Sequence, residues 1–162
     1  MEQSIPTRPK DWSFGPLHFY NPKERDWYAR HTPTVERWLT EFEEAGDPWW
    51  QSAEHAASCL VSSTVFVTQG RPSWDAFNVP DFLFSELWEG GTVGFFGSVP
   101  IFFDQLMEAL RRFAADGLVD AAVAADWLTE MKSAREDFIR CYDDETSELA
   151  ATEISRRWRR AA

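Results

Sequence analysis

Hydrophobic side chains recur every three or four positions along two segments, the spacing that places them on one face of an α-helix. Over residues 99–115 they fall at Val99, Phe102, Phe103, Leu106, Met107, Leu110, Phe113 and Ala114. Over residues 120–142 they fall at Ala124, Trp127, Leu128, Met131, Phe138 and Tyr142. Charged and amide side chains fill the positions between. Both segments are therefore predicted to be amphipathic helices that bury one face.

Prolines that follow helix-capping side chains predict where other helices begin. Asn, Thr and Asp accept hydrogen bonds from the first helical turn, and proline is tolerated at the first helical position. Such pairs occur at Asn21-Pro22, Thr32-Pro33 and Asp47-Pro48, while Pro80-Asp81 and Ser98-Val99-Pro100 mark less regular starts. With Asp120 as a further cap, the pattern predicts helices at about 22–30, 33–45, 48–62, 80–88, 99–115, 120–142 and 147–160.

Two segments do not follow this helical pattern. Residues 1–20 carry prolines among the aromatic residues Trp12, Phe14 and Tyr20, which is typical of an extended arm that its aromatic side chains pin to the body. Ser58–Thr68 is rich in β-branched residues, so the pattern leaves open whether this segment is helical or a short strand.

The sequence predicts a single all-α domain over residues 1–162. No interior linker, repeat or low-complexity tract divides it. Aromatic residues make up 15% of the chain, so material for a core is plentiful. We expect a compact irregular or orthogonal bundle of about six or seven helices, with an extended aromatic N-terminal arm over residues 1–20 and a basic C-terminal helix over residues 146–162.

The net charge is −11, and it is unevenly distributed. From Thr146 onwards four arginines outnumber two glutamates, so this segment carries +2 and the rest of the chain −13. An acidic body repels phosphate backbones, which disfavours nucleic acid as a partner. The charge favours a basic protein partner, or it only keeps the chain soluble.

Several features point to a cytoplasmic location. Cys59 and Cys141 are far apart among apolar residues, as expected of reduced thiols and not of a disulfide framework. The N-terminus has no apolar segment of the secretory type. The most apolar stretch, Val93–Phe103, is interrupted by glycine and proline and is too short to cross a membrane.

Recognisable catalytic chemistry is missing from the sequence. His18, His31 and His55 form no pair at the spacing of metal ligands on a helix, and the cysteines have neither CxxC spacing nor a nearby histidine signature. The glycine-rich segment 90–97 precedes a predicted helix but lacks the strand and the lysine of a phosphate-binding loop. We therefore assign no catalytic residue, no metal and no cofactor, and favour a binding role over an enzymatic one.

An acidic and aromatic stretch is the first candidate for partner binding. Glu41, Glu43, Glu44 and Asp47 lie at the end of a predicted helix, where the helix dipole disfavours negative charge. Trp49 and Trp50 follow, and on a helix they diverge by about 100°. One is expected to enter the core. The other either serves as an interface anchor or packs under the N-terminal arm.

The second candidate is the basic end of the chain, with residues Arg156, Arg157, Trp158, Arg159 and Arg160. These arginines complement the dipole of their own helix, lie across the acidic face of the same chain, or dock on another subunit.

Three functional hypotheses follow. The favoured one is a small acidic protein-binding protein, such as an inhibitor, immunity protein or adaptor. The second is a structural subunit of a larger assembly, with association between copies of the chain left open. The third is a helical enzyme or metal protein that uses scattered carboxylates and histidines.

Overall fold

The computed structural model describes residues 8–16, 18–19, 21–66, 71–87, 98–143 and 146–161. These residues contain helices and no strand, so the prediction of an all-α fold is confirmed for them. The helical segments are α1 (Pro22–Ala45), α2 (Trp50–Phe66), η1 (Trp74–Ala76), α3 (Val79–Asp81), η2 (Phe82–Glu86), α5 (Val99–Ala115), α6 (Ala121–Cys141) and α7 (Glu148–Ala161). Over this part of the chain, no helix is both long enough and apolar enough to span a bilayer.

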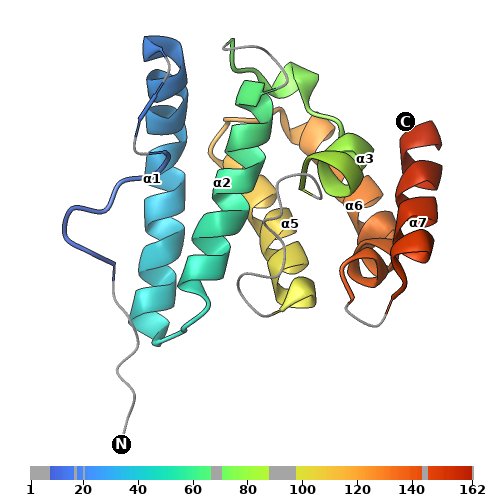
Figure 1. Cartoon of the computed structure of the whole chain (residues 1–162). Helices are drawn as coiled ribbons and strands as arrows, with labels where there is room; N and C mark the ends of the chain where they lie inside the picture. The colour runs from blue at the N-terminus through green and yellow to red at the C-terminus, as the bar shows by residue number, and fades with distance from the viewer. Residues whose placement is uncertain are drawn as a thin grey trace, which may run out of the picture.

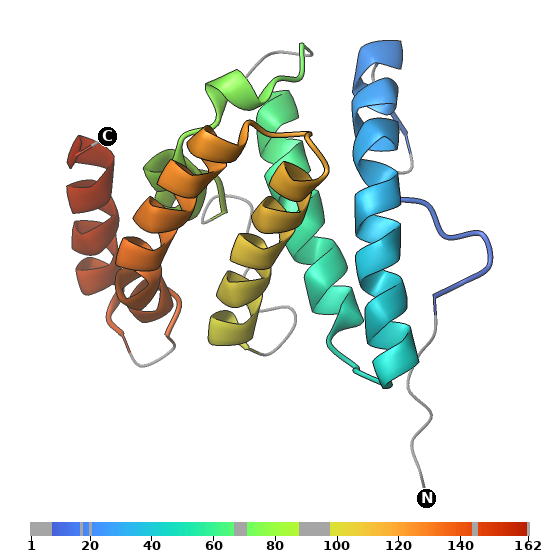
Figure 2. The same ribbon diagram turned by 180° about the vertical axis from the view of Figure 1, so that it is seen from behind.

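The long helices lie side by side in an order that follows the chain (Figure 1). Helix α2 packs between α1 and α5, α5 packs on α6, and α6 packs on α7. The short segment α3 contacts α6 and α7, and η2 contacts α7. The reverse view agrees that α1 and α7 occupy opposite edges of the molecule (Figure 2). The two candidate partner-binding segments therefore lie at opposite edges.

Aromatic side chains from several elements meet in the core. Phe82, Phe103, Phe113 and Phe138 are fully buried, and the ring centroids of Phe103 and Phe138 are 4.9 Å apart. Trp74 of η1 is also buried, with its ring 5.9 Å from that of Phe113. Contacts of this kind join helices that are distant in the sequence and add specific geometry to apolar burial.

The predicted break at Thr32-Pro33 is wrong, because α1 runs through Pro33 without interruption. Proline has no N–H to donate, so the carbonyl of Ala29 loses its helical partner. Pro33 and Ala29 are both exposed, which leaves that carbonyl accessible to water. Residues on the opposite side of α1 are buried both before and after the proline. The free energy gained from this packing exceeds the cost of a proline inside the helix.

Most of the other predicted boundaries are close to the observed ones. Helix α5 has the predicted bounds 99–115, with the Ser98 hydroxyl accepting from the Ile101 N–H. Asp120 caps α6 as predicted. The ambiguous segment is helical as far as Phe66, and Val67 and Thr68 lie outside the described residues.

The segment predicted as a helix over 80–88 differs in two respects. It begins at Val79 with Asn78 as the capping residue, and it changes to π-helical geometry over Phe82–Glu86. Helix α2 likewise begins at Trp50, two residues later than predicted, because Pro48 and Trp49 form a turn.

Residues before α1 contact it through aromatic side chains. The Phe14 and Phe19 rings lie 5.6 and 5.5 Å from that of Tyr28. Between them, Gly15 has φ = 113°, and a Cβ there would lie 3.0 Å from the Tyr28 ring, so the close approach requires glycine. The predicted arm is observed only at residues 8–16, 18 and 19, since the remainder of residues 1–20 lies outside the described part.

Candidate functional site

The acidic stretch occupies the C-terminal half of α1, and its carboxylates differ in exposure. Glu36, Glu41 and Glu44 are exposed, and Glu43 is half-buried. Gly46 ends the helix in the left-handed conformation (φ = 66°), and the last turn contains no basic residue. We call this set the α1 acidic surface.

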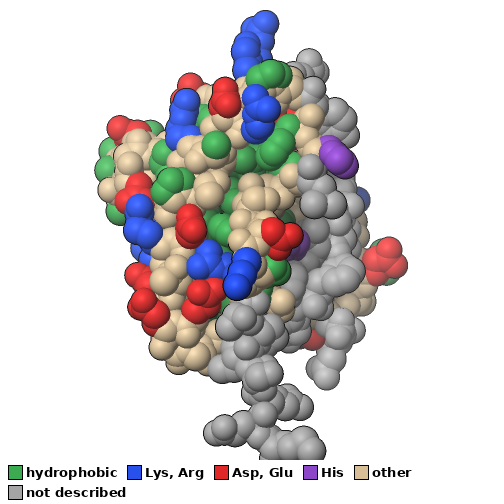
Figure 3. Space-filling model, turned by 90° about the vertical axis from the view of Figure 1, so that its left-hand side faces the viewer, with side chains coloured by type: hydrophobic (Ala, Val, Ile, Leu, Met, Phe, Trp, Pro, Cys, Tyr) green, Lys and Arg blue, Asp and Glu red, His purple; other side chains and the backbone are tan. Residues whose placement is uncertain are grey.

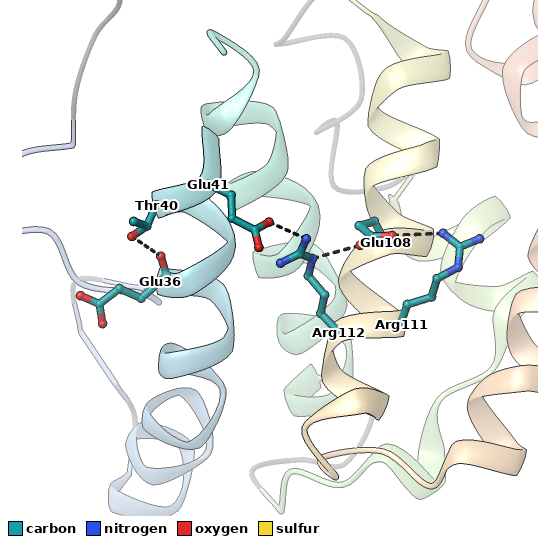
Figure 4. Close-up of polar contacts among 6 residues, drawn as sticks. All are labelled: Glu36, Thr40, Glu41, Glu108, Arg111 and Arg112. Carbon is teal, nitrogen blue, oxygen red and sulfur yellow. Dashed lines mark hydrogen bonds and ion pairs between the residues drawn. The ribbon is translucent and has the colours of Figure 1, made fainter. Parts of the chain in front are cut away.

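Helix α5 supplies a cation to this surface (Figure 4). The Arg112 Nη2 donates to Glu41 Oε2 at 2.6 Å, and its Nε donates to Glu108 Oε1 at 3.0 Å. The guanidinium also lies 5.4 Å from the centre of the Trp38 ring. Burial lowers the pKa of Arg112, but the hydrogen bonds to both glutamates outweigh burial and raise it overall. Glu41 is thus neutralised from within the chain.

Glu43 is neutralised from the N-terminal side. The Arg8 Nε donates to Glu43 Oε1 at 2.5 Å, and its Nη2 donates to the Thr40 hydroxyl at 3.0 Å. This hydrogen bond from Arg8 holds the pKa of Glu43 below its usual value. The Arg8 guanidinium also lies 4.9 Å from the centre of the Trp12 ring. The pairing therefore joins the N-terminal segment to the end of α1.

Glu36 and Glu44 are different, because neither forms an ion pair with any described residue. Both line a shallow hollow of about 430 Å³ on the outer side of α1, together with Pro33, Arg37, Thr40 and Glu41. Arg37, the basic residue in this lining, is paired with Asp116. In Figure 4 the Glu36 carboxylate points away from Arg112. Within the α1 acidic surface, Glu36 and Glu44 are therefore the glutamates without an ion pair in the described residues, although Arg8 also attracts Glu36 electrostatically.

Asp47, Trp49 and Trp50, at the connection from α1 to α2, have different structural roles. Asp47 Oδ1 accepts from the Trp49 N–H at 2.9 Å, so Asp47 stabilises the turn before α2. Trp50 is buried (4% exposed) and enters the core, which leaves it outside any binding surface. Trp49 is half-buried, and its carbonyl accepts from Gln105 of α5. Of the two tryptophans, Trp49 is the one that retains exposed area.

The basic end of the chain forms α7, and Trp158 anchors it. The indole stacks on Phe84 at a centroid distance of 5.5 Å and an interplanar angle of 15°, and its Nε1 donates to Asp137 at 2.8 Å. Arg157 also pairs with Asp137, at 3.4 Å. Because α7 lies at the edge opposite α1, it does not cover the α1 acidic surface. The other arginines, Arg156, Arg159 and Arg160, are exposed.

The interpretation that neither cysteine has a nearby histidine is wrong for Cys59. Cys59 Sγ lies 3.6 Å from His55 Nε2, so this cysteine does have a nearby histidine. Their spacing of four residues on one helix was the available signal. The contact does not form a metal site, because the described residues contain no group of three His, Cys, Asp or Glu side chains arranged to hold a metal ion. The glycine-rich segment 90–97 lies outside the described residues.

His31 is the most buried histidine of the described part. Its Nε2 accepts from Trp74 Nε1 at 3.0 Å, and its Nδ1 lies 2.8 Å from the Trp27 carbonyl. This arrangement matches the neutral ring with hydrogen on Nδ1. Burial lowers the pKa of His31 to about 4. The residue therefore connects α1 to η1 inside the core and does not face a site.

Comparison with known proteins does not assign the chain to a class: no family model, no curated protein and no solved structure matches it. The function has to be argued from the surfaces described above.

Proposed function

We propose that this chain is a small acidic protein-binding protein whose α1 acidic surface engages a basic partner. The observation that carries the proposal is the contrast between two pairs of glutamates. Glu41 and Glu43 are neutralised by Arg112 and Arg8, whereas Glu36 and Glu44 are exposed beside a hollow without an ion pair in the described residues. Complementary charge on a partner would stabilise the unpaired glutamates and steer association.

The spacing of these glutamates specifies what the partner must offer. Glu36 and Glu44 are eight positions apart, which corresponds to about 12 Å along the helix axis. Thr40 lies midway between them on the same side of α1. A partner with two Lys or Arg side chains about 12 Å apart would match both carboxylates. Trp49, which keeps exposed area near the end of α1, would extend the contact with an aromatic group.

The test is affinity purification from the native host followed by mass spectrometry and titration with the purified partner. We expect a partner with a basic surface, and at least a tenfold loss of affinity in the double variant Glu36→Lys/Glu44→Lys. The matched control is Asp126→Lys/Glu130→Lys, which changes the net charge equally at two exposed positions of α6. Equal loss in both variants, or unchanged binding in the first, would contradict the proposal.

A second candidate function is a structural subunit that joins a larger assembly, or further copies of itself, through α7. Its supporting observation is Leu149, which is 84% exposed on a helix that also presents three exposed arginines, none of which forms an ion pair with a described residue. The test is the triple variant Leu149→Asp/Arg156→Glu/Arg160→Glu, which keeps Trp158 and therefore the attachment of α7. Copurification that fails in this variant but survives Glu36→Lys/Glu44→Lys would favour the second candidate.

We also propose that the protein is cytoplasmic. The N-terminal arm, residues 1–20, is proposed to belong to the same binding protein. Fractionation of host cells tests the location. A helical enzyme or metal protein remains the third hypothesis, and stoichiometric metal in freshly purified protein would promote it.

A further inference from the structure

A second hollow lies on the N-terminal half of α1, and its charge is opposite to that of the α1 acidic surface. It has a volume of about 500 Å³ and is lined by Lys23, Asp26, Trp27, Arg30, Arg71, Pro72 and Ser73. Four of these residues come from α1, and three come from the segment that precedes η1. We call it the basic hollow. Figure 3 looks onto the outer side of α1, where some Lys and Arg side chains lie at the upper end and others lie lower, beside Asp and Glu.

The cations of the basic hollow are not neutralised by the fold. Lys23, Arg30 and Arg71 form no ion pair with any described residue, although Asp26 lines the same hollow. Lys23 occupies the first turn of α1, where the helix dipole disfavours a cation. Like charges that line one hollow repel one another, and a bound anion would reduce this repulsion.

Arg30 contacts an aromatic ring that is itself anchored, which favours one position of its guanidinium. Its guanidinium lies 5.4 Å from the centre of the Trp27 ring. Trp27 is fixed in turn, because its Nε1 donates to the Thr64 hydroxyl at 2.8 Å. Ser73 Oγ accepts from the Asp75 N–H, which leaves its own hydroxyl hydrogen available to donate. A guanidinium that is already ordered loses less conformational entropy when it binds.

From this arrangement we infer that the basic hollow binds a phosphate-type oxyanion, either free phosphate or the phosphate group of a small molecule. A doubly charged oxyanion can accept from two guanidiniums, an ammonium and a hydroxyl at once. It also retains a net attraction after the single charge of Asp26 is counted. The basic hollow and the α1 acidic surface share no lining residue, although Arg30 and Glu36 are only six positions apart on α1, about 9 Å along the helix axis.

The inference is tested by calorimetric titration of the full chain at low ionic strength with inorganic phosphate, adenosine monophosphate and adenosine. Phosphate and the nucleotide are expected to bind saturably at one site, whereas adenosine is not. Tighter binding of the nucleotide would identify a phosphorylated small molecule as the source, and equal affinities would identify free phosphate. The variants Arg30→Ala and Arg71→Ala should each raise the Kd at least fivefold.

Two further variants separate a specific site from general surface charge. Arg25→Ala removes an exposed charge from the same helix without altering the lining, so its Kd should change less than twofold. Asp26→Asn removes the opposing carboxylate and should lower the Kd severalfold. The inference is overturned if no saturable binding occurs, if Arg25→Ala weakens binding as much as Arg71→Ala, or if Asp26→Asn fails to strengthen it.

Discussion

At the scale of single residues, the burial and hydrogen bonding of His31 make the stability of the protein depend on pH. Burial lowers its pKa from 6.5 to about 4, and the indole of Trp74 donates to its Nε2. Protonation of the folded protein would place a charge in the core and remove that acceptor. In the unfolded chain the same ring has its usual pKa of 6.5 and takes up a proton below that pH. The contribution of neutral His31 is therefore complete above about pH 6.5 and is lost as the pH falls toward 4.

We expect His31 to remove about 2 kcal/mol from the free energy of unfolding between pH 7.5 and pH 5. Urea denaturation at a series of pH values measures this. The variant His31→Gln keeps an acceptor for Trp74 but does not titrate, so its free energy of unfolding should depend less on pH in this range. His18→Gln, at an exposed position, is the control and should follow the wild-type curve. Parallel pH curves for wild type and His31→Gln would contradict the prediction.

At the scale of elements, α1 shows tertiary packing overriding a helix-breaking residue. Tyr28 and His31 before Pro33, and Val35 and Trp38 after it, are buried on the same helix. Ending the helix at Pro33 would expose one of these sets. Burying an apolar side chain of this size contributes about 1.5–3 kcal/mol, and several of them exceed the cost of one internal proline, about 3 kcal/mol.

The replacement Pro33→Ala should therefore stabilise the protein by about 1–3 kcal/mol, because it restores an N–H donor to the Ala29 carbonyl. Pro33 is exposed, so the change removes no core contact. Thermal denaturation followed by circular dichroism measures the effect. The matched control is Pro22→Ala at the start of α1, where proline is well tolerated and no stabilisation is expected. Destabilisation by Pro33→Ala would show that the proline has a role in the fold.

At the scale of the whole molecule, the question is whether α7 belongs to one cooperative unit with the other helices. Ala151 and Ile154 of α7 are buried, and Trp158 stacks on Phe84 while its indole donates to Asp137. These contacts join α7 to η2 and α6. We therefore expect a single unfolding transition for the domain predicted over residues 1–162, with circular dichroism and tryptophan fluorescence giving the same midpoint.

Trp158→Ala should weaken the attachment of α7 by about 2–3 kcal/mol, less than for a fully buried tryptophan because this side chain is half-buried. Hydrogen exchange should then accelerate in α7 before it accelerates in α2 or α5. Arg159→Ala, one residue further along and exposed, serves as the control and should leave exchange unchanged. Equal acceleration in all helices would mean that α7 unfolds only with the rest.

Features that depend on neighbours within a turn or two could be predicted from the order of residues. The apolar spacing and the Ser98 cap located α5, and Asp120 located the start of α6, because capping and amphipathic periodicity are local properties. The pattern also indicated that one of Trp49 and Trp50 would be buried, which is correct for Trp50, although Trp49 lies in the turn before α2 and not on the predicted helix.

Which local signals prevail, and which charges remain unpaired, depends on packing between helices. Pro33 does not end α1, and Ser58–Phe66 is helical, because both segments bury side chains against other helices. Arg112 lies 71 residues from Glu41, and Arg71 lies 41 residues from Arg30, so no spacing rule could bring either pair together. The free energy of such contacts depends on distances in space, which the order of residues along the chain does not express.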